Sequence, residues 1–174
     1  FQQNISWKDW VISIMETFSI LQDMYEEVDI LAFSTGCNLA IYTLQFDWRC
    51  KIRNVILACP NFVVHPSERI FKFLLNIPIL SNLLINLYPI TQKPARKRRK
   101  HSGNIKDKTF NNKLYEAALP TYSVREVWRF QDILPDTINA DNIIILKSNN
   151  DRVVGDIFKQ KTILESIYKK EIDI

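Results

Sequence analysis

Ser34 is the residue whose surroundings best suit nucleophilic chemistry. It lies in "DILAFSTGCNLAIYTL" (29–44), where a short apolar run ends at Phe33 and a helix-like pattern begins directly afterwards. A residue on a sharp turn between a buried parallel strand and a helix lies at the carboxyl edge of the sheet, where α/β proteins bind their ligands. The Ser34 hydroxyl could attack a carbonyl carbon there, and the N–H of Thr35 at the helix start could hold the resulting oxyanion.

Small residues flank this serine on both sides. Ala32 lies two positions before Ser34 and Gly36 two positions after it, and a strained turn demands small neighbours. We therefore interpret "AFSTG" as a variant of the G-x-S-x-G nucleophile elbow, with alanine in the first small position. The alternative is an ordinary N-cap serine at a strand-to-helix junction, which is common.

Asp151 is the candidate acid. It follows the apolar run "NIIILKS" (142–148), which predicts another buried strand, and the segment "SNND" then places Asp151 at the same edge of the sheet as Ser34. A carboxylate at that position could orient a general base toward the serine. The alternative is a turn aspartate in an Asn-rich loop.

The elements that must position these two residues alternate between helix and strand. The pattern predicts buried strands at 28–33, 54–59 and 142–148, and helices at about 6–26, 35–47 and 157–170. Ser6 and Asp9 are spaced like a capping box at the start of the first helix. Alternation of this kind indicates a parallel sheet with crossover helices, its strands buried on both faces.

The middle of the chain has a different character. We expect a helical cap or lid insertion at 64–123, carrying a basic loop at 93–101, on an α/β core formed by 1–63 and 124–174. The segment 70–90 has the length of a membrane span but contains Lys72, three asparagines and Pro78. Two short helices broken near Pro78 fit it better.

Taken together, the elbow, the helix before it and the block from Leu114 to Val154 resemble the α/β-hydrolase superfamily. Within it, the chain is most similar to the carboxylesterase, monoacylglycerol lipase, lysophospholipase and serine aminopeptidase branch. The resemblance implies a three-layer αβα core, and a serine hydrolase that cleaves acyl esters through an acyl-enzyme without a metal or organic cofactor. Asp151 matches the acid of a G-x-x-D-x-V-V motif, with Ser148 at the position of the family's glycine.

The third member of the family's triad has no counterpart. The family's order is serine, acid, histidine, whereas His65 and His101 both precede Asp151 and are expected to be loop residues. The resemblance thus implies an interior fragment, incomplete at both ends, that lacks the base and the second oxyanion donor and is weakly active or inactive alone. The closing "KKEIDI" looks like the start of the next strand. A non-catalytic hydrolase-like module that binds a lipid or a protein partner is the alternative.

Charge and composition limit the classes of partner that the chain is expected to bind. The chain has 174 residues, 47% of them hydrophobic, and a net charge of +4. Six basic residues lie between Lys93 and Lys100; without them 17 basic residues face 19 acidic ones. Because the positive charge is local, we expect no nucleic-acid partner, but peripheral contact of residues 70–100 with an anionic membrane is a candidate. Three cysteines without metal-ligand spacing and no signal peptide indicate reduced thiols in a cytoplasmic protein.

Overall fold

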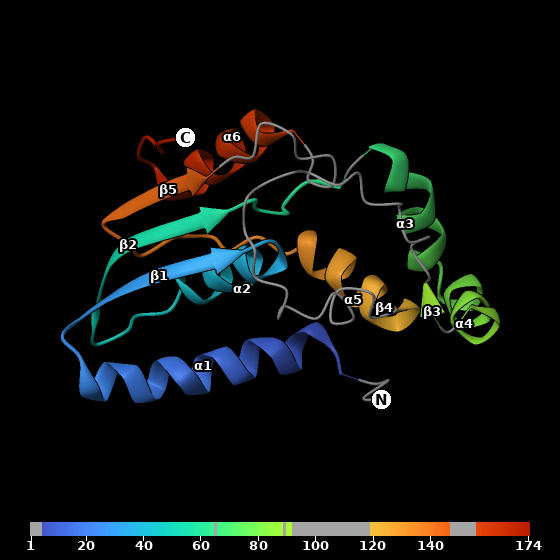
Figure 1. Ribbon diagram of the computed structural model, residues 1–174, viewed down its shortest axis with the longest axis horizontal. Coiled ribbons are helices and arrows are strands. Elements are labelled where there is room, and N and C mark those ends of the chain that lie inside the picture. The colour runs from blue at the N-terminus through green and yellow to red at the C-terminus, as the bar shows by residue number, and fades with distance from the viewer. Residues whose placement is uncertain (1–4, 65, 89, 92–118, 147–155) are drawn as a thin grey trace, which may run out of the picture.

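The computed structural model describes residues 5–64, 66–88, 90–91, 119–146 and 156–174 (Figure 1). Its centre is a parallel three-stranded sheet in the order β1-β2-β5, which confirms the predicted α/β class. The strands are β1 (Glu27–Phe33), β2 (Lys51–Ala58) and β5 (Asn142–Leu146), and the helices packed on them are α1 (Trp7–Met24), α2 (Thr35–Thr43) and α6 (Ile157–Tyr168).

The first helix begins where its capping residues predict. The Ser6 N–H donates to Asp9 Oδ2 at 2.7 Å, and the Ser6 hydroxyl reaches the same oxygen at 2.8 Å. These bonds lower the pKa of the Asp9 carboxyl, the side-chain bond from Ser6 being the larger cause. Further along α1, Phe18 is buried and stacks on Trp48, with 5.2 Å between ring centroids. The amphipathic pattern therefore serves to hold α1 against the core.

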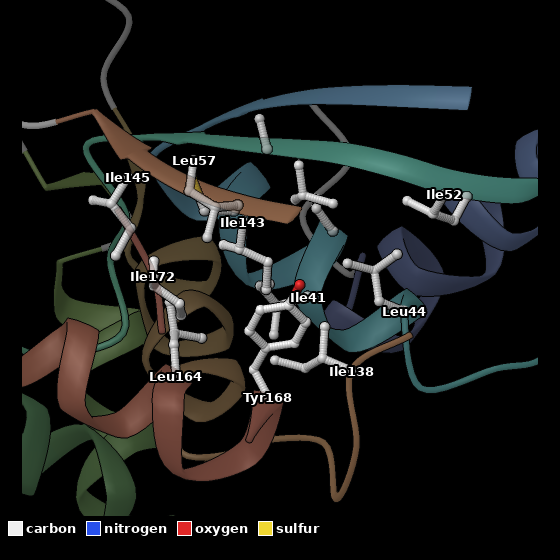
Figure 2. Close-up of a cluster of buried hydrophobic side chains, with 14 of the residues drawn as sticks. Ile41, Leu44, Ile52, Leu57, Ile138, Ile143, Ile145, Leu164, Tyr168 and Ile172 are labelled. Atoms are coloured by element: carbon white, nitrogen blue, oxygen red, sulfur yellow. The ribbon is translucent and has the colours of Figure 1, made fainter. Parts of the chain in front are cut away.

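The hydrophobic core lies on one face of the sheet. Figure 2 shows Leu57, Ile143 and Ile145 pointing from the strands toward Leu164 and Tyr168 of α6. The remaining buried members come from the strands, the three packed helices and the segments next to them: Phe18, Ala32, Cys37, Ala40, Ile41, Leu44, Cys50, Ile52, Val55, Phe62, Ile138, Ile157 and Ile172.

None of the described helices covers the opposite face of the sheet, contrary to the expectation that the strands are buried on both faces. Leu31 is 75% exposed, Phe33 70% and Leu146 49%. The described residues thus form two layers, helices on one face of a sheet, and not the expected three. Right-handed crossovers explain this arrangement: β1 leads through α2 to β2, and β5 leads through α6 to Asp173, always stepping in the same direction, so these helices fall on the same face.

The segment after α6 returns to the sheet. Asp173 forms a parallel bridge with Ile144, and the Ile145 N–H donates to the Asp173 carbonyl oxygen at 2.9 Å. Ile172 beside it is fully buried. The predicted start of a further strand at "KKEIDI" is therefore confirmed as a one-residue bridge next to β5.

Between β2 and β5 most of the described residues are helical. As predicted, two helices meet near Pro78, at an angle of 108°. The sequence did not predict the short antiparallel pair of β3 with β4, since two residues show no periodicity. The elements are η1 (Pro66–Glu68), α3 (Arg69–Asn76), α4 (Pro78–Leu87), β3 (Ile90–Thr91), β4 (Leu119–Pro120) and α5 (Thr121–Gln131).

Helices α3 and α4 lie beyond the carboxyl ends of the strands, toward which the arrows of β1 and β2 point (Figure 1). Helix α5 contacts both of them and also contacts α1 and α2. The expected domain boundary at residue 123 falls inside α5. Among the described helices, none is by itself long and apolar enough to cross a membrane; α3 and α4 reach that hydropathy together, as a bent pair.

Candidate functional site

Ser34 occupies a strained turn between β1 and α2. Its φ of 52° and ψ of −122° lie in a region that glycine adopts readily and other residues rarely do. A non-glycine residue held there costs about 1–3 kcal/mol and persists only where its surroundings enforce it. Thr35, the next residue, is already the first residue of α2, so the chain reverses its course within one residue.

Backbone hydrogen bonds hold this turn from both sides. The Ser34 N–H donates to the Ala58 carbonyl oxygen at 3.0 Å, which ties the turn to the end of β2. The Ser34 carbonyl oxygen accepts the Cys37 N–H at 3.0 Å, which ties it to α2. The Cys37 thiol also donates to the Ala58 oxygen, at 3.5 Å. The sheet and the helix together therefore enforce the strained conformation of Ser34.

The turn presents polar groups at a half-buried position. Ser34, Thr35 and Gly36 are each intermediate between buried and exposed. As the first amide of a nine-residue helix, the Thr35 N–H has no acceptor within α2. Among the described residues, none forms a hydrogen bond with Ser34 Oγ. A hydroxyl and a helix N-terminal donor at one turn can attack a carbonyl carbon and hold its oxyanion.

The two small neighbours of Ser34 differ in how much space surrounds them. Ala32 is buried in the core, where a larger side chain would have to displace its neighbours. At Gly36, by contrast, an added Cβ would meet no heavy atom within 4 Å. The steric reason given for Gly36 is therefore wrong for this structure, although the position of the glycine matches the motif.

The carboxyl ends of the three strands lie level with one another. Just as Ser34 donates to Ala58 at the end of β2, Cys59 donates its N–H to the Leu146 carbonyl oxygen at the end of β5, at 2.9 Å. The chain therefore leaves β5 at the same sheet edge that carries Ser34. Leu146 lies two strands away from the serine in the order β1-β2-β5.

The candidate acid itself falls outside the described residues. This holds for Asp151 and for the other motif positions Ser148, Val153 and Val154, and also for His65 and His101. Asp156, where the description resumes, caps α6: its Oδ1 accepts the Phe158 N–H at 2.9 Å and the Lys159 N–H at 3.4 Å. The carboxylate of Asp156 is thus engaged in holding the helix start.

Two buried residues beside Ser34 were not predicted from the sequence. Asn38, one turn into α2, donates through Nδ2 to the Asn61 carbonyl oxygen at 3.2 Å, while its buried Oδ1 has no partner among the described residues. Cys37 has no exposed surface, and burial raises the pKa of its thiol to about 12. No periodic pattern marks either residue, because Cys37 contacts the last residue of β2 and Asn38 contacts the loop that follows it.

A cavity of about 270 Å³ lies at the other edge of the sheet, lined in part by Trp48, Lys51, Asn139 and Asp141. Its charged groups already pair with each other, Lys51 Nζ lying 2.7 Å from Asp141 Oδ2. Asn139 likewise donates to Asp47 Oδ1 at 3.2 Å. This cavity is therefore separate from the Ser34 turn, and its polar side chains satisfy one another.

No group of three or more histidine, cysteine, aspartate or glutamate side chains is placed to hold a metal ion within the part of the chain that the structure describes. Comparison with known proteins adds no assignment: no protein-family model matches the chain, and the curated proteins contain no match to it.

Proposed function

We propose that this chain carries the nucleophile of a serine hydrolase that cleaves carboxylic esters with an apolar acyl group. The observation that supports this proposal most directly is the backbone of Ser34, with its φ of 52° between β1 and α2. Strained backbone concentrates at functional sites, because selection otherwise removes it. An N-cap serine in the ordinary extended conformation would carry no such cost.

In the proposed reaction, Ser34 Oγ attacks the ester carbonyl carbon and the new C–O bond converts the carbonyl oxygen to an oxyanion. The Thr35 N–H stabilises that charge, the alcohol leaves, and water then hydrolyses the acyl-enzyme. Asp151 is proposed to orient the base that takes the serine proton. Neither histidine of the chain lies among the described residues, and without a positioned base the rate falls by several orders of magnitude.

The side chains around α3 and α4 favour a substrate with an apolar acyl group. Large apolar side chains of α3, α4 and the residues directly after each helix are exposed beyond the sheet edge that carries Ser34: Ile70, Phe73, Ile77, Ile79, Leu83, Leu87 and Tyr88. The basic run 93–100 follows closely in the sequence. A segment that combines exposed apolar side chains with a basic run in its sequence suits the surface of an anionic bilayer, from which such a substrate could be drawn.

A fluorophosphonate probe tests the nucleophile. The probe phosphonylates activated serines, and we expect labelling of the 174-residue chain at Ser34, slow but detectable by mass spectrometry of peptides. The variant Ser34→Ala should lose the label, whereas Ser166→Ala, at an exposed position of α6, should keep it. Labelling that survives Ser34→Ala contradicts the assignment. A chain whose Ser34 stays unlabelled after prolonged exposure would favour the non-catalytic module instead.

Co-sedimentation with vesicles tests the membrane contact separately. We expect the chain to bind vesicles containing phosphatidylserine more tightly than neutral ones. The double variant Ile79→Gln/Leu83→Gln should weaken binding at least several-fold. Ile20→Gln/Met24→Gln, which removes two comparably exposed apolar side chains from α1, serves as the control. Equal binding to neutral and anionic vesicles, or equal loss in both variants, removes this part of the proposal.

A further inference from the structure

Two cysteines lie at the Ser34 turn, where the proposed reaction does not use them. Cys37 is in the first turn of α2, and its Sγ lies 3.5 Å from the Ala58 carbonyl oxygen. Cys59 is the residue bonded to that carbonyl, directly after β2. The thiol of Cys37 is thus in contact with the peptide unit that leads into Cys59.

The backbone at Cys59 is unusual as well. Its φ is 50°, a left-handed value that a non-glycine residue rarely adopts, and its N–H is fixed by the Leu146 carbonyl oxygen at 2.9 Å. Ser34 and Cys59 therefore leave neighbouring parallel strands through similarly strained turns. Strain of this kind marks a position that the surrounding structure holds in place.

The two thiols differ in access to solvent. Cys37 is fully buried, and burial, with the nearby Cys59 as the second cause, raises the pKa of the Cys37 thiol to about 12. Cys59 is only partly buried. An oxidant in solution therefore reaches Cys59 first, and Cys37 is protected until a reactive sulfur forms beside it.

We propose that Cys37 and Cys59 form a thiol pair that a hydroperoxide oxidises to a disulfide, cross-linking the nucleophile turn to the end of β2. Cys59 sulfur attacks one peroxide oxygen, the O–O bond breaks, and a sulfenic acid and water form from hydrogen peroxide. Cys37 sulfur then attacks the sulfenic sulfur, the S–O bond breaks, and the thiol proton leaves with the hydroxide as a second water. Two thiols lose two electrons, and the peroxide gains them.

The cross-link would act on the backbone that carries Ser34. It would join the residue whose N–H bonds to the Ser34 carbonyl oxygen with the residue after Ala58, the acceptor of the Ser34 N–H. Oxidation should therefore slow hydrogen exchange at the Ser34 and Cys37 amides. A thiol reductant should restore the original exchange rates. This consequence does not depend on the hydrolase proposal, because exchange reports backbone opening and not turnover.

Peptide mapping after mild oxidation tests the pair. The 174-residue chain is treated with equimolar hydrogen peroxide, unfolded with iodoacetamide present, and digested. We expect a Cys37–Cys59 cross-linked peptide, with Cys50 recovered as the alkylated thiol. Cys50 is the matched control, since it is buried at the other edge of the sheet. Cys50→Ser should leave the cross-link intact, and Cys59→Ser should abolish it.

The wild-type map is decisive even if a variant fails to fold. A disulfide that includes Cys50, an intermolecular dimer through Cys59, or Cys59 accumulating as sulfinic acid with Cys37 still reduced would each overturn the proposal. Formation of the cross-link without any slowing of the Ser34 amide would overturn its effect on the turn.

Discussion

The Ser34 N–H and the Ala58 carbonyl oxygen are joined across 3.0 Å, so the hydrogen-bond ladder between β1 and β2 continues one residue past the end of β1 and into the turn. A residue in the left-handed region would ordinarily relax to a more favourable φ. Here relaxation would break this bond and the one from Cys37 as well. The strain of Ser34 is thus balanced by hydrogen bonds that close only in the strained conformation.

Replacing Ser34 with glycine should relieve this strain. Glycine adopts a φ of 52° without a Cβ clash, but it costs about 0.5–1 kcal/mol of extra chain entropy on folding. Against a strain of about 1–3 kcal/mol, Ser34→Gly should be more stable than Ser34→Ala by about 1 kcal/mol. Urea denaturation of the two variants measures the difference. Equal or lower stability of the glycine variant would show that the turn is not strained in solution.

The stability of the chain should fall in alkaline solution through Cys37. Its pKa is raised to about 12 in the folded state, so the folded chain holds this proton more tightly than the unfolded chain. The protonated thiol of Cys37 therefore contributes to the free energy of unfolding in full below the unfolded pKa of about 9, and this contribution is lost as the pH rises toward about 12. Denaturation of the wild type and Cys37→Ala across this range isolates it, because other titrating groups are common to both. Parallel curves would contradict the expectation.

Glu126 of α5 should be important for the packing of α5 against α4. Its side chain is 3% exposed and pairs with Arg125 at 3.2 Å and Arg129 at 3.1 Å, while Arg125 also donates to the buried Ser81 hydroxyl at 3.1 Å. Glu126→Gln leaves the buried Arg125 charge, 11% exposed, without its counter-ion. Loss of one partner of such a pair costs about 3 kcal/mol.

The matched control for this pair is Asp23→Asn. Asp23 pairs with Arg49 on the surface of the protein, with both side chains more than half exposed. Exposed pairs contribute about 0–1 kcal/mol, so this variant should barely change the unfolding free energy. A similar effect of the two substitutions would mean that burial does not strengthen the Glu126 interactions.

The sheet face that no described helix covers should govern self-association. The double variant Leu31→Gln/Phe33→Gln replaces two large, solvent-exposed apolar side chains with polar ones. Surface substitutions usually change the free energy of unfolding by less than about 0.5 kcal/mol. We expect less light scattering at high concentration with nearly unchanged unfolding. Leu57→Ala, on the packed face of the neighbouring strand, should instead cost about 2–5 kcal/mol. Unchanged scattering in the double variant would place the association surface elsewhere.

Much of the fold could be predicted from the alternation of short apolar runs with amphipathic stretches. This alternation also predicted that the strands are parallel and that Ser34 lies at a strand-to-helix turn, because both features depend on local sequence order. What local order does not contain is the number of layers. An apolar strand such as 28–33 reads the same whether one face or both are covered, so the exposure of Leu31 and Phe33 could be found only from the three-dimensional packing.

At the Ser34 site too, features set by local sequence order could be predicted, whereas contacts between distant segments could not. A sharp, strained turn at Ser34 was predicted from the change of strand to helix pattern, although the steric reason given for Gly36 was wrong. The contacts of Cys37 and Asn38 were not predicted, because Cys37 meets the end of β2 and Asn38 the loop after it, each more than 20 residues along the chain. Asp151 stays a prediction outside the described residues.

Helix α5 contacts α1 and α2 on the side of the sheet and α3 and α4 on the side of the cap. Any tilt of the cap would therefore move α5 against α2, whose first residue follows Ser34. Helix α5 therefore connects the packing of α3 and α4 with that of α2, so a displacement that α5 shares with α3 and α4 would also change the contacts of α2. Phe130 of α5 makes the aromatic part of this contact: its ring lies 5.3 Å from that of Trp7 in α1 and 5.6 Å from that of Tyr42 in α2, measured between centroids.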